Sequence, residues 1–194
     1  MIVFNDNDLQ NFERINGRLY APSGDYSQIK NFGEEIIFSD NCKFGDKSTF
    51  GERCIFGNNS TFGESCKFGN SCNFGNGCVL GDTCTIGEFN KFGNNCKFRE
   101  MIFFSGSCIF GEKCIFENKH IAKAGHPLLT FGGFGSISKV IYCFNCEDGI
   151  FIRFGWFSVY IEEFNNYICK KYNKNIYEEY KLIIDLVKMK WYNK

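Results

Sequence analysis

A large apolar side chain occupies every sixth position from Phe32 to Phe116, fifteen times in succession and without a break in register. Phe fills all of these positions except two, Leu80 and Ile86. A step of six residues advances about 600° around an α-helix, so the stripe would leave any single helix face. The period therefore indicates a coil of short extended segments with flat sides.

A small residue stands two positions before most of these apolar residues. The set is Cys42, Ser48, Cys54, Ser60, Cys66, Cys72, Cys78, Cys84, Cys96, Cys108 and Cys114. Residues two apart in a strand point to the same side, so we predict that these side chains face inward beside the Phe side chains. A buried thiol acts as a small hydrophobe that complements the bulk of Phe. We therefore expect reduced, buried cysteines rather than a disulfide scaffold, although the chain has 12 of them.

Gly follows the apolar residue in most repeats, and Asp, Glu or Asn follows Gly, as in Phe44-Gly45-Asp46. Such pairs are typical of tight corners with positive φ angles. We attribute the columns of Asn residues 18 positions apart to the same left-handed geometry. A second column, Asp46, Glu64, Asp82 and Glu100, is predicted to stack carboxylates along one corner, either solvated or compensated by neighbouring cations.

The repeat resembles that of hexapeptide left-handed parallel β-helices, in which three units make one triangular coil. The resemblance implies the left hand and the three-sided section. Residues 18 apart would then stack at about 4.8 Å. We predict a mainly β chain with an N-terminal cap over 1–31, a left-handed parallel β-helix over 32–116 and a small α+β domain over 117–194.

The C-terminal segment has a different pattern. Residues 139–144 and 149–154 are predicted to form an antiparallel hairpin, and residues 161–172 a helix. A second helix is predicted from Asn175, because Asn175 and Glu178 have the spacing of a capping box. Together these elements would form a ββαα domain.

The whole layout resembles uncharacterised proteins of phages and low-GC Gram-positive bacteria, which join a Phe-Gly-Cys β-helix to such a domain. The matching segments besides the repeats are 16–26, 133–136, 148–153 and 162–164. The chain departs from these proteins at 154–157, where they tend to carry Cys near Trp156. The resemblance implies a viral or mobile-element origin and no particular activity.

The charge balance limits the classes of partner that the chain is expected to bind. With 22 basic and 22 acidic residues, the chain is not expected to bind nucleic acid. No apolar run is long enough to cross a bilayer, and the N-terminus has no signal-peptide pattern, so we expect no membrane partner and a cytoplasmic location, in the host cytoplasm if a phage encodes it.

Catalytic and metal-binding signals are weak. Two histidines, His120 and His126, are too few for the three-His zinc site of a γ-type carbonic anhydrase. Cys143 and Cys146 form a single C-x-x-C pair without a second pair. We therefore expect no metal, no cofactor and no enzyme activity. The alternative is an acyltransferase of the hexapeptide type in which His126 is the general base.

A group of residues after the coils suggests a binding site. The Gly-rich segment 131–136 offers backbone donors, Arg153 a planar donor fork and Trp156 a stacking face. We expect an anionic, nucleotide-like ligand at a site made of Lys123, His126, Gly133, Gly135, Arg153 and Trp156.

In the last coil the outward residues become apolar, at Phe103, Ile109 and Ile115. We predict that they form the interface of a homotrimer or lie beneath the following domain. The favoured function is a non-enzymatic, phage-type trimeric scaffold that captures a small anionic ligand, such as a nucleotide signal of host defence. The alternative to ligand capture is a structural or protein-interaction module without a small ligand.

Overall fold

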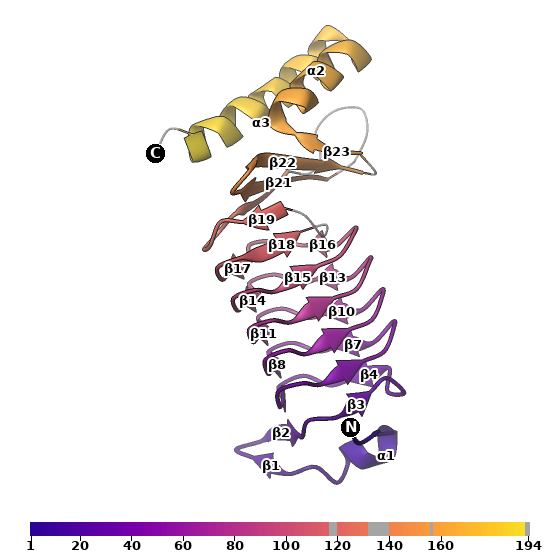
Figure 1. Cartoon of the computed structure of the whole chain (residues 1–194). Coiled ribbons are helices and arrows are strands. Elements are labelled where there is room, and N and C mark those ends of the chain that lie inside the picture. Colours follow the sequence, from indigo (N-terminus) through magenta and orange to yellow (C-terminus); the bar gives the residue numbers. More distant parts are fainter. Residues whose placement is uncertain (117–119, 132–139, 156, 193–194) are drawn as a thin grey trace. The chain divides into compact units, whose positions relative to one another are not determined.

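The computed structural model describes residues 1–116, 120–131, 140–155 and 157–192. The chain divides into two compact units, Met1–His126 and Pro127–Lys194. The first is mainly β and the second contains the long helices (Figure 1). Each unit is described by itself.

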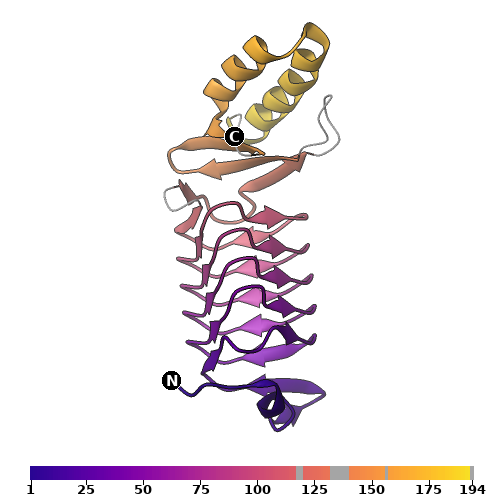
Figure 2. The same cartoon turned by 90° about the vertical axis from the view of Figure 1, so that its right-hand side faces the viewer.

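The first unit is a parallel solenoid of about five turns, and the strands of its coils form three flat faces. Figure 2 shows the strands stacked in columns. The first face contains β3 (Asp25–Tyr26), β6 (Lys43–Phe44), β9 (Thr61–Phe62), β12 (Val79–Leu80), β15 (Lys97–Phe98) and β18 (Cys114–Phe116). The second contains β4 (Asn31–Phe32), β7 (Thr49–Phe50), β10 (Lys67–Phe68), β13 (Thr85–Ile86) and β16 (Phe103–Phe104). The third contains β2 (Arg18–Ala21), β5 (Ile36–Phe38), β8 (Ile55–Phe56), β11 (Asn73–Phe74), β14 (Lys91–Phe92) and β17 (Ile109–Phe110).

Strand pairing follows the six-residue period. Residues 18 apart are partners, as in Lys43↔Thr61 on the first face and Asn73↔Lys91 on the third. The predicted three-sided coil with residues 18 apart in register is therefore confirmed.

The N-terminal segment covers the first coil and also contributes to it. A short helix, α1 (Asp6–Leu9), begins with a capping box between Asn5 and Asp8. Next, β1 (Arg14–Ile15) pairs antiparallel with β2, and β2 and β3 pair parallel with β5 and β6 of the next coil. The strand stack thus begins before residue 32.

The core of the solenoid consists of aromatic columns. Rings 18 residues apart are stacked face to face, as in Phe32 and Phe50, with centroids 4.8 Å apart and planes at 6°. Rings six residues apart meet edge to face, as in Phe50 and Phe56, at 5.0 Å and 89°. Both geometries are favourable for aromatic pairs, each adding about 0.5–1.5 kcal/mol beyond area burial. The spacing between coils and the angle between faces therefore place the Phe rings in both favourable arrangements.

The nine cysteines of the repeat are buried, as the sequence predicts. Most donate a hydrogen bond to the carbonyl of a corner glycine 21 residues earlier, for example Cys54 to Gly33 at 3.4 Å and Cys96 to Gly75 at 3.3 Å. Burial raises the pKa of the Cys42 thiol to about 11 and that of Cys108 to about 12. The hydrogen-bonded thiols are therefore structural groups that tie one coil to the previous corner.

We expect one fast-reacting thiol per native chain, because Cys169 is exposed and the other 11 cysteines are buried. Titration with an aromatic disulfide reagent at pH 8 should modify Cys169 at once and the remaining thiols only after denaturation. The Cys169→Ser variant should lose the fast phase. Rapid modification of several thiols in that variant would contradict the inward placement.

The corners differ from the prediction that Gly supplies the positive φ angle. The left-handed residue is the one directly before the inward Cys or Ser, with φ between 56° and 61° at Asn41, Lys47, Arg53, Asn59, Ser65 and Ser71. Gly is required two positions earlier for space, because a Cβ at Gly69 would lie 2.7 Å from the carbonyl carbon of Gly51. Close approach of successive coils, rather than dihedral angle, selects Gly there.

The Asn columns are also explained differently from the prediction. Asn58 and Asn76 do not have positive φ; instead each side-chain Oδ1 accepts the backbone N–H of the next corner, from Asn76 at 2.7 Å and from Asn94 at 2.7 Å. Asp46 does the same for Glu64 at 2.8 Å. The amide column is therefore a hydrogen-bond ladder between coils, and in the acidic column Asp46 and Asp82 make the same contact to the next coil.

The second unit has more strands than the predicted hairpin. Its described strands pair antiparallel in the order β20 (Leu128–Phe131), β21 (Ile141–Cys146), β22 (Gly149–Phe154) and β23 (Phe157–Tyr160). The hairpin between β21 and β22 confirms the two predicted strands, but β20 and β23 were not predicted. Both are short, and their partly buried side chains lack a clear alternation.

Two helices complete the second unit, α2 (Ile161–Lys171) and α3 (Lys174–Tyr192). Their apolar faces pack with one face of β21 and β22 in a core that includes Ile152, Phe164 and Tyr180. The predicted cap of the second helix is wrong by two residues. The capping residue is Asn173, whose Oδ1 accepts the N–H of Ile176 at 3.1 Å. Asn175 lies inside α3.

Candidate functional site

The residues predicted to bind a ligand fall into three groups. Lys123 and His126 are exposed in the first unit, after β19 (His120–Ala122), which pairs antiparallel with β18. Arg153 belongs to the second unit. The remaining three, Gly133, Gly135 and Trp156, lie outside the described residues. A single site made of all six therefore stays a prediction.

Arg153 is buried rather than exposed. It lies on β22 opposite Tyr142 of β21, and only 2% of it is exposed. Its guanidinium carbon lies 4.4 Å from the centroid of the Tyr142 ring and 5.9 Å from that of Phe144. Cation–π contacts of this kind contribute roughly 0.5–2 kcal/mol and fix the plane of the guanidinium. Arg153 is thus a preorganised cation among aromatic rings.

The cysteine pair of the second unit is not arranged as a chelate. Cys143 and Cys146 lie three residues apart in the same strand, so their side chains point to opposite faces of the sheet. Cys143 packs in the core beneath the helices, and burial raises its pKa. Within the described residues no group of three or more His, Cys, Asp or Glu side chains is placed to hold a metal ion.

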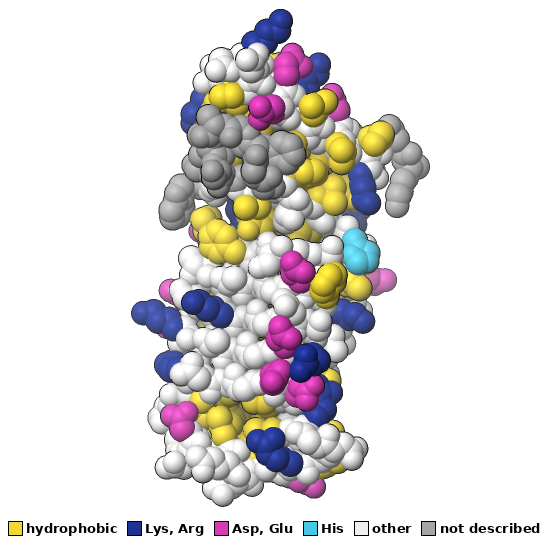
Figure 3. Space-filling view, turned by 180° about the vertical axis from the view of Figure 1, so that it is seen from behind, with side chains coloured by type: hydrophobic (Ala, Val, Ile, Leu, Met, Phe, Trp, Pro, Cys, Tyr) yellow, Lys and Arg dark blue, Asp and Glu magenta, His cyan; other side chains and the backbone are white. Residues whose placement is uncertain are grey.

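A groove with a volume of about 550 Å³ follows the first face of the solenoid. Its basic residues are Lys30, Lys43 and Arg99, and its acidic residues are Asp46 and Glu64. Figure 3 likewise shows acidic side chains beside basic ones on the coils. Because the charges are mixed, the groove has no clear preference for an anion or a cation.

Two of its lysines already have partners within the chain. Lys30 Nζ donates to the carbonyls of Ser27 and Asp46, each at 3.0 Å. Lys43 Nζ lies 3.3 Å from Asp25 Oδ2. These contacts tie neighbouring coils together, which is a structural role.

An apolar edge stands out at the corner that joins the second face to the third. Phe89 occupies this corner with φ of 59° and is 62% exposed. In the next coil Phe103 on one side of the corner is 40% exposed, and Ile109 on the other side is 37% exposed. We call Phe89, Phe103 and Ile109 the Phe89 edge. Phe89 shares its positive φ with residues at the same place in other corners, such as Arg53 and Met101, so its exposed aromatic side chain is what sets it apart.

At the corner and on the second face the equivalent positions in earlier coils are polar, whereas the column of Ile109 also contains Ile37 and Ile55, which are partly buried. The corner position of Phe89 is held by Glu35, Arg53 and Ser71 in earlier coils, while Phe103 pairs with Thr85 and Ile109 with Lys91. Phe103 and Ile109 were predicted as interface residues, and both are exposed. The third, Ile115, is partly buried and pairs with Ile121 of β19.

Phe89 was missed by the sequence analysis, which examined only the outward residue of each strand. The available signal was the corner position directly before each inward Cys or Ser. Read down one corner, that position changes from polar residues to Phe at 89.

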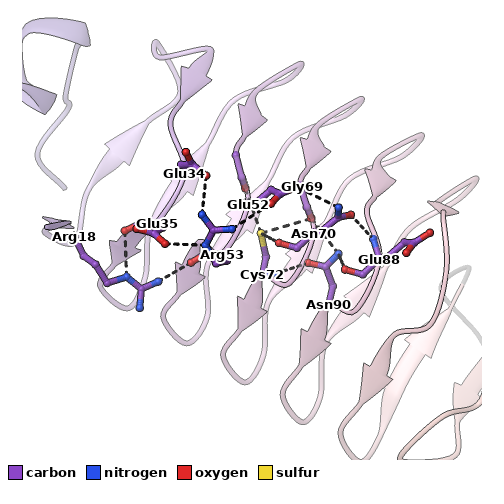
Figure 4. A network of polar contacts seen from close by, with 11 residues as sticks. Arg18, Glu34, Glu35, Glu52, Arg53, Gly69, Asn70, Cys72, Glu88 and Asn90 are labelled. Carbon is purple, nitrogen blue, oxygen red and sulfur yellow. Dashed lines mark hydrogen bonds and ion pairs between the residues drawn. The ribbon is translucent and has the colours of Figure 1, made fainter. Parts of the chain in front are cut away.

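The same corner is polar in the earlier coils, where it is held by charge and amide contacts (Figure 4). Arg53 forms ion pairs with Glu35 at 2.7 Å, Glu34 at 2.9 Å and Glu52 at 3.3 Å. The hydrogen bond from Arg53 lowers the pKa of Glu35. These groups are solvent-exposed, so each pair adds little stability.

Asn90 closes this corner from inside, at a position where neighbouring coils have Cys. Its Oδ1 accepts the N–H of Cys72 at 2.8 Å, and its Nδ2 donates to the carbonyls of Gly87 at 2.8 Å and Gly69 at 3.2 Å. The side chain is fully buried and both ends of its amide are hydrogen-bonded. Asn90 therefore joins the coil of Phe89 to the previous coil. Because Asn90 follows Phe89 in the sequence, these hydrogen bonds hold the corner of the Phe89 edge in place.

Comparison of the chain with protein-family models, with curated proteins and with solved structures gives no match. Across the described residues, neither α2 nor α3 nor the short α1 has the length and hydrophobicity to pass through a bilayer as a helix.

Proposed function

We propose that this protein is a non-enzymatic phage-type binding protein, whose solenoid is a left-handed β-helix of the hexapeptide type that assembles as a homotrimer. The assembly would act in the cytoplasm and capture a small anionic, nucleotide-like ligand, such as a host-defence signal. The observation that carries the proposal is the Phe89 edge, where an aromatic residue at a corner and two apolar residues on the adjoining strands are exposed close to one another. Exposed apolar groups gathered on a rigid polar scaffold are typical of protein interfaces.

The solenoid suits such a role because its side chains are used for stability. The Phe columns, the thiols and the corner ladders are satisfied within the coil stack, which leaves a rigid body with few residues for chemistry. For an anionic ligand the support is the chemistry of Arg153 alone, because its guanidinium contacts Tyr142 and only 2% of the residue is exposed. A fixed guanidinium loses little entropy when it binds phosphate or carboxylate.

We expect the wild-type protein to be a trimer at low micromolar concentration in native mass spectrometry. A triple variant, Phe89→Ser, Phe103→Thr and Ile109→Lys, should be mainly monomeric, because it removes the apolar contact. These substitutions copy the residues that the chain itself has at Ser71, Thr85 and Lys91, so the solenoid should remain folded. The control Thr49→Lys, which copies Lys67 on the same face, should remain a trimer.

The same spectra test the ligand. A trimer that retains an additional small mass, or that gives heat in a calorimetric titration with a panel of linear and cyclic nucleotides, supports capture of an anion. A wild-type monomer contradicts the assembly. A trimer with neither retained mass nor heat contradicts the ligand and leaves an interaction module.

A further inference from the structure

Helix α3 has two apolar stripes, and only one of them faces the core of its own unit. The core stripe contains Tyr180, Ile183, Ile184 and Val187, all buried. The other stripe contains Leu182, Leu186 and Met189, whose exposed fractions are 69%, 49% and 62%. We call these three residues the α3 seam.

The seam lies on the side of the helix away from the core. At about 100° per residue, its three residues fall within an arc of about 60°, centred roughly 140° from the middle of the core stripe. Their spacing of four and then three residues is that of the a and d positions of a heptad, the pattern by which one helix packs against another. The seam is therefore a continuous apolar strip and not three scattered surface residues.

Charges beside the seam indicate what covers it. With Leu186 at position a, Asp185 lies at g and Lys190 at the following e position. In a parallel coiled coil a g residue meets the e residue five positions later in the partner helix. Asp185 of one copy would therefore meet Lys190 of another, and the symmetric contact would repeat the pair with the opposite orientation.

Both charged groups are available for that contact. Within the described part of the chain, neither Asp185 nor Lys190 has an ion pair or a side-chain hydrogen bond. By contrast, Lys188 on another side of α3 lies 3.6 Å from Glu162 of α2. The seam thus has self-complementary charges in addition to its apolar residues.

We propose that α3 packs parallel against α3 of a second copy of this chain through Leu182, Leu186 and Met189, with Asp185 and Lys190 of the two copies paired. A seam of two helical turns is short for a coiled coil, so the contact is weak alone and strengthens an assembly of the whole chain. This surface is separate from the Phe89 edge, and each can be wrong without the other.

The test uses the triple variant Phe89→Ser, Phe103→Thr and Ile109→Lys as background, which removes the solenoid contact. Sedimentation equilibrium from micromolar to millimolar concentration should show residual self-association of this variant. Adding Leu186→Lys should abolish it. Adding Asp185→Lys should weaken it roughly tenfold by placing like charges together, and so should Lys190→Asp.

Combining Asp185→Lys with Lys190→Asp should restore the association, because the pair is reformed with its signs exchanged. Lys170→Asp, a charge change at an exposed position of α2, is the control and should have no effect. A triple variant that remains monomeric at millimolar concentration overturns the seam but leaves the proposed trimer intact. Additive weakening in the double charge variant, without restoration, overturns the parallel pairing. If the wild-type protein forms no trimer but still associates through the α3 seam, only the proposed trimer is overturned.

Discussion

Replacement of Phe56 by Ala is expected to lower the free energy of unfolding by about 3–5 kcal/mol, the range for deletion of a buried aromatic side chain. Phe56 is 1% exposed. Its ring stacks on Phe38 with centroids 5.3 Å apart and on Phe74 at 4.8 Å, and it meets Phe50 and Phe62 edge to face. The cavity cannot close easily, because hydrogen-bonded strands on three faces fix the width of the coil.

Urea denaturation followed by circular dichroism measures this loss. Two controls separate ring packing from general disturbance of the coil. Phe56→Leu should cost clearly less than Phe56→Ala, since Leu80 shows that the stack accommodates an aliphatic residue. Phe103→Ala, at an exposed position, should change stability by no more than about 0.5 kcal/mol. Equal losses in Phe56→Ala and Phe103→Ala would contradict the aromatic column as the main source of stability.

Gly69→Ala is expected to destabilise the solenoid by about 1–3 kcal/mol or more, the range for overpacking of a filled interior. A Cβ at Gly69 would lie 2.7 Å from the carbonyl carbon of Gly51 and 2.8 Å from the backbone nitrogen of Glu52. Backbone atoms of a neighbouring coil cannot rotate away as a side chain can. The strands above and below would have to separate.

Gly33→Ala is the matched control for this prediction. Gly33 holds the same place at the same corner in the first coil, where a Cβ would meet nothing within 4 Å, and its φ is not positive. Alanine there should leave stability unchanged or raise it by about 0.4–1 kcal/mol through the unfolded chain. The pair of variants is compared by the same urea titration. If Gly33→Ala is as damaging as Gly69→Ala, a dihedral requirement rather than coil spacing explains the glycines.

Some elements of the second unit could not be predicted from sequence patterns. The hairpin and the two helices were predicted because apolar residues alternate or recur with a period on one face. The outer strands β20 and β23 have partly buried side chains on both sides, so they have no clear period. The choice of Asn173 rather than Asn175 as the helix cap depended on which Asn reaches an unpaired N–H, and two positions with the same side chain cannot be separated by type alone.

For the candidate surfaces, the sequence showed where outward residues change from polar to apolar, but not how these residues are arranged in space. Phe103 was visible as the first apolar outward residue in the polar series of its own face, and Ile109 as an apolar residue after Asn73 and Lys91. Phe89 became part of the same edge only when its corner was seen to lie between their strands. Arg153 was chosen for its chemistry, and its burial against Tyr142 depends on a pairing of strands that no local pattern contains.

The six-residue period by itself determined a coil of short extended segments with inward columns of Phe and Cys, because a repeated unit makes the same local choice at every step. The three-sided section and the 18-residue register were implied by the resemblance to hexapeptide β-helices, and the strand pairing of the structure establishes them. Only the tertiary structure explains which residue types occupy the corners. Gly is needed where one coil presses on the backbone of the next, and Asn or Asp where a side-chain oxygen meets the N–H of the next coil. These are contacts between residues 18 positions apart, and such contacts exist only after the coils have stacked.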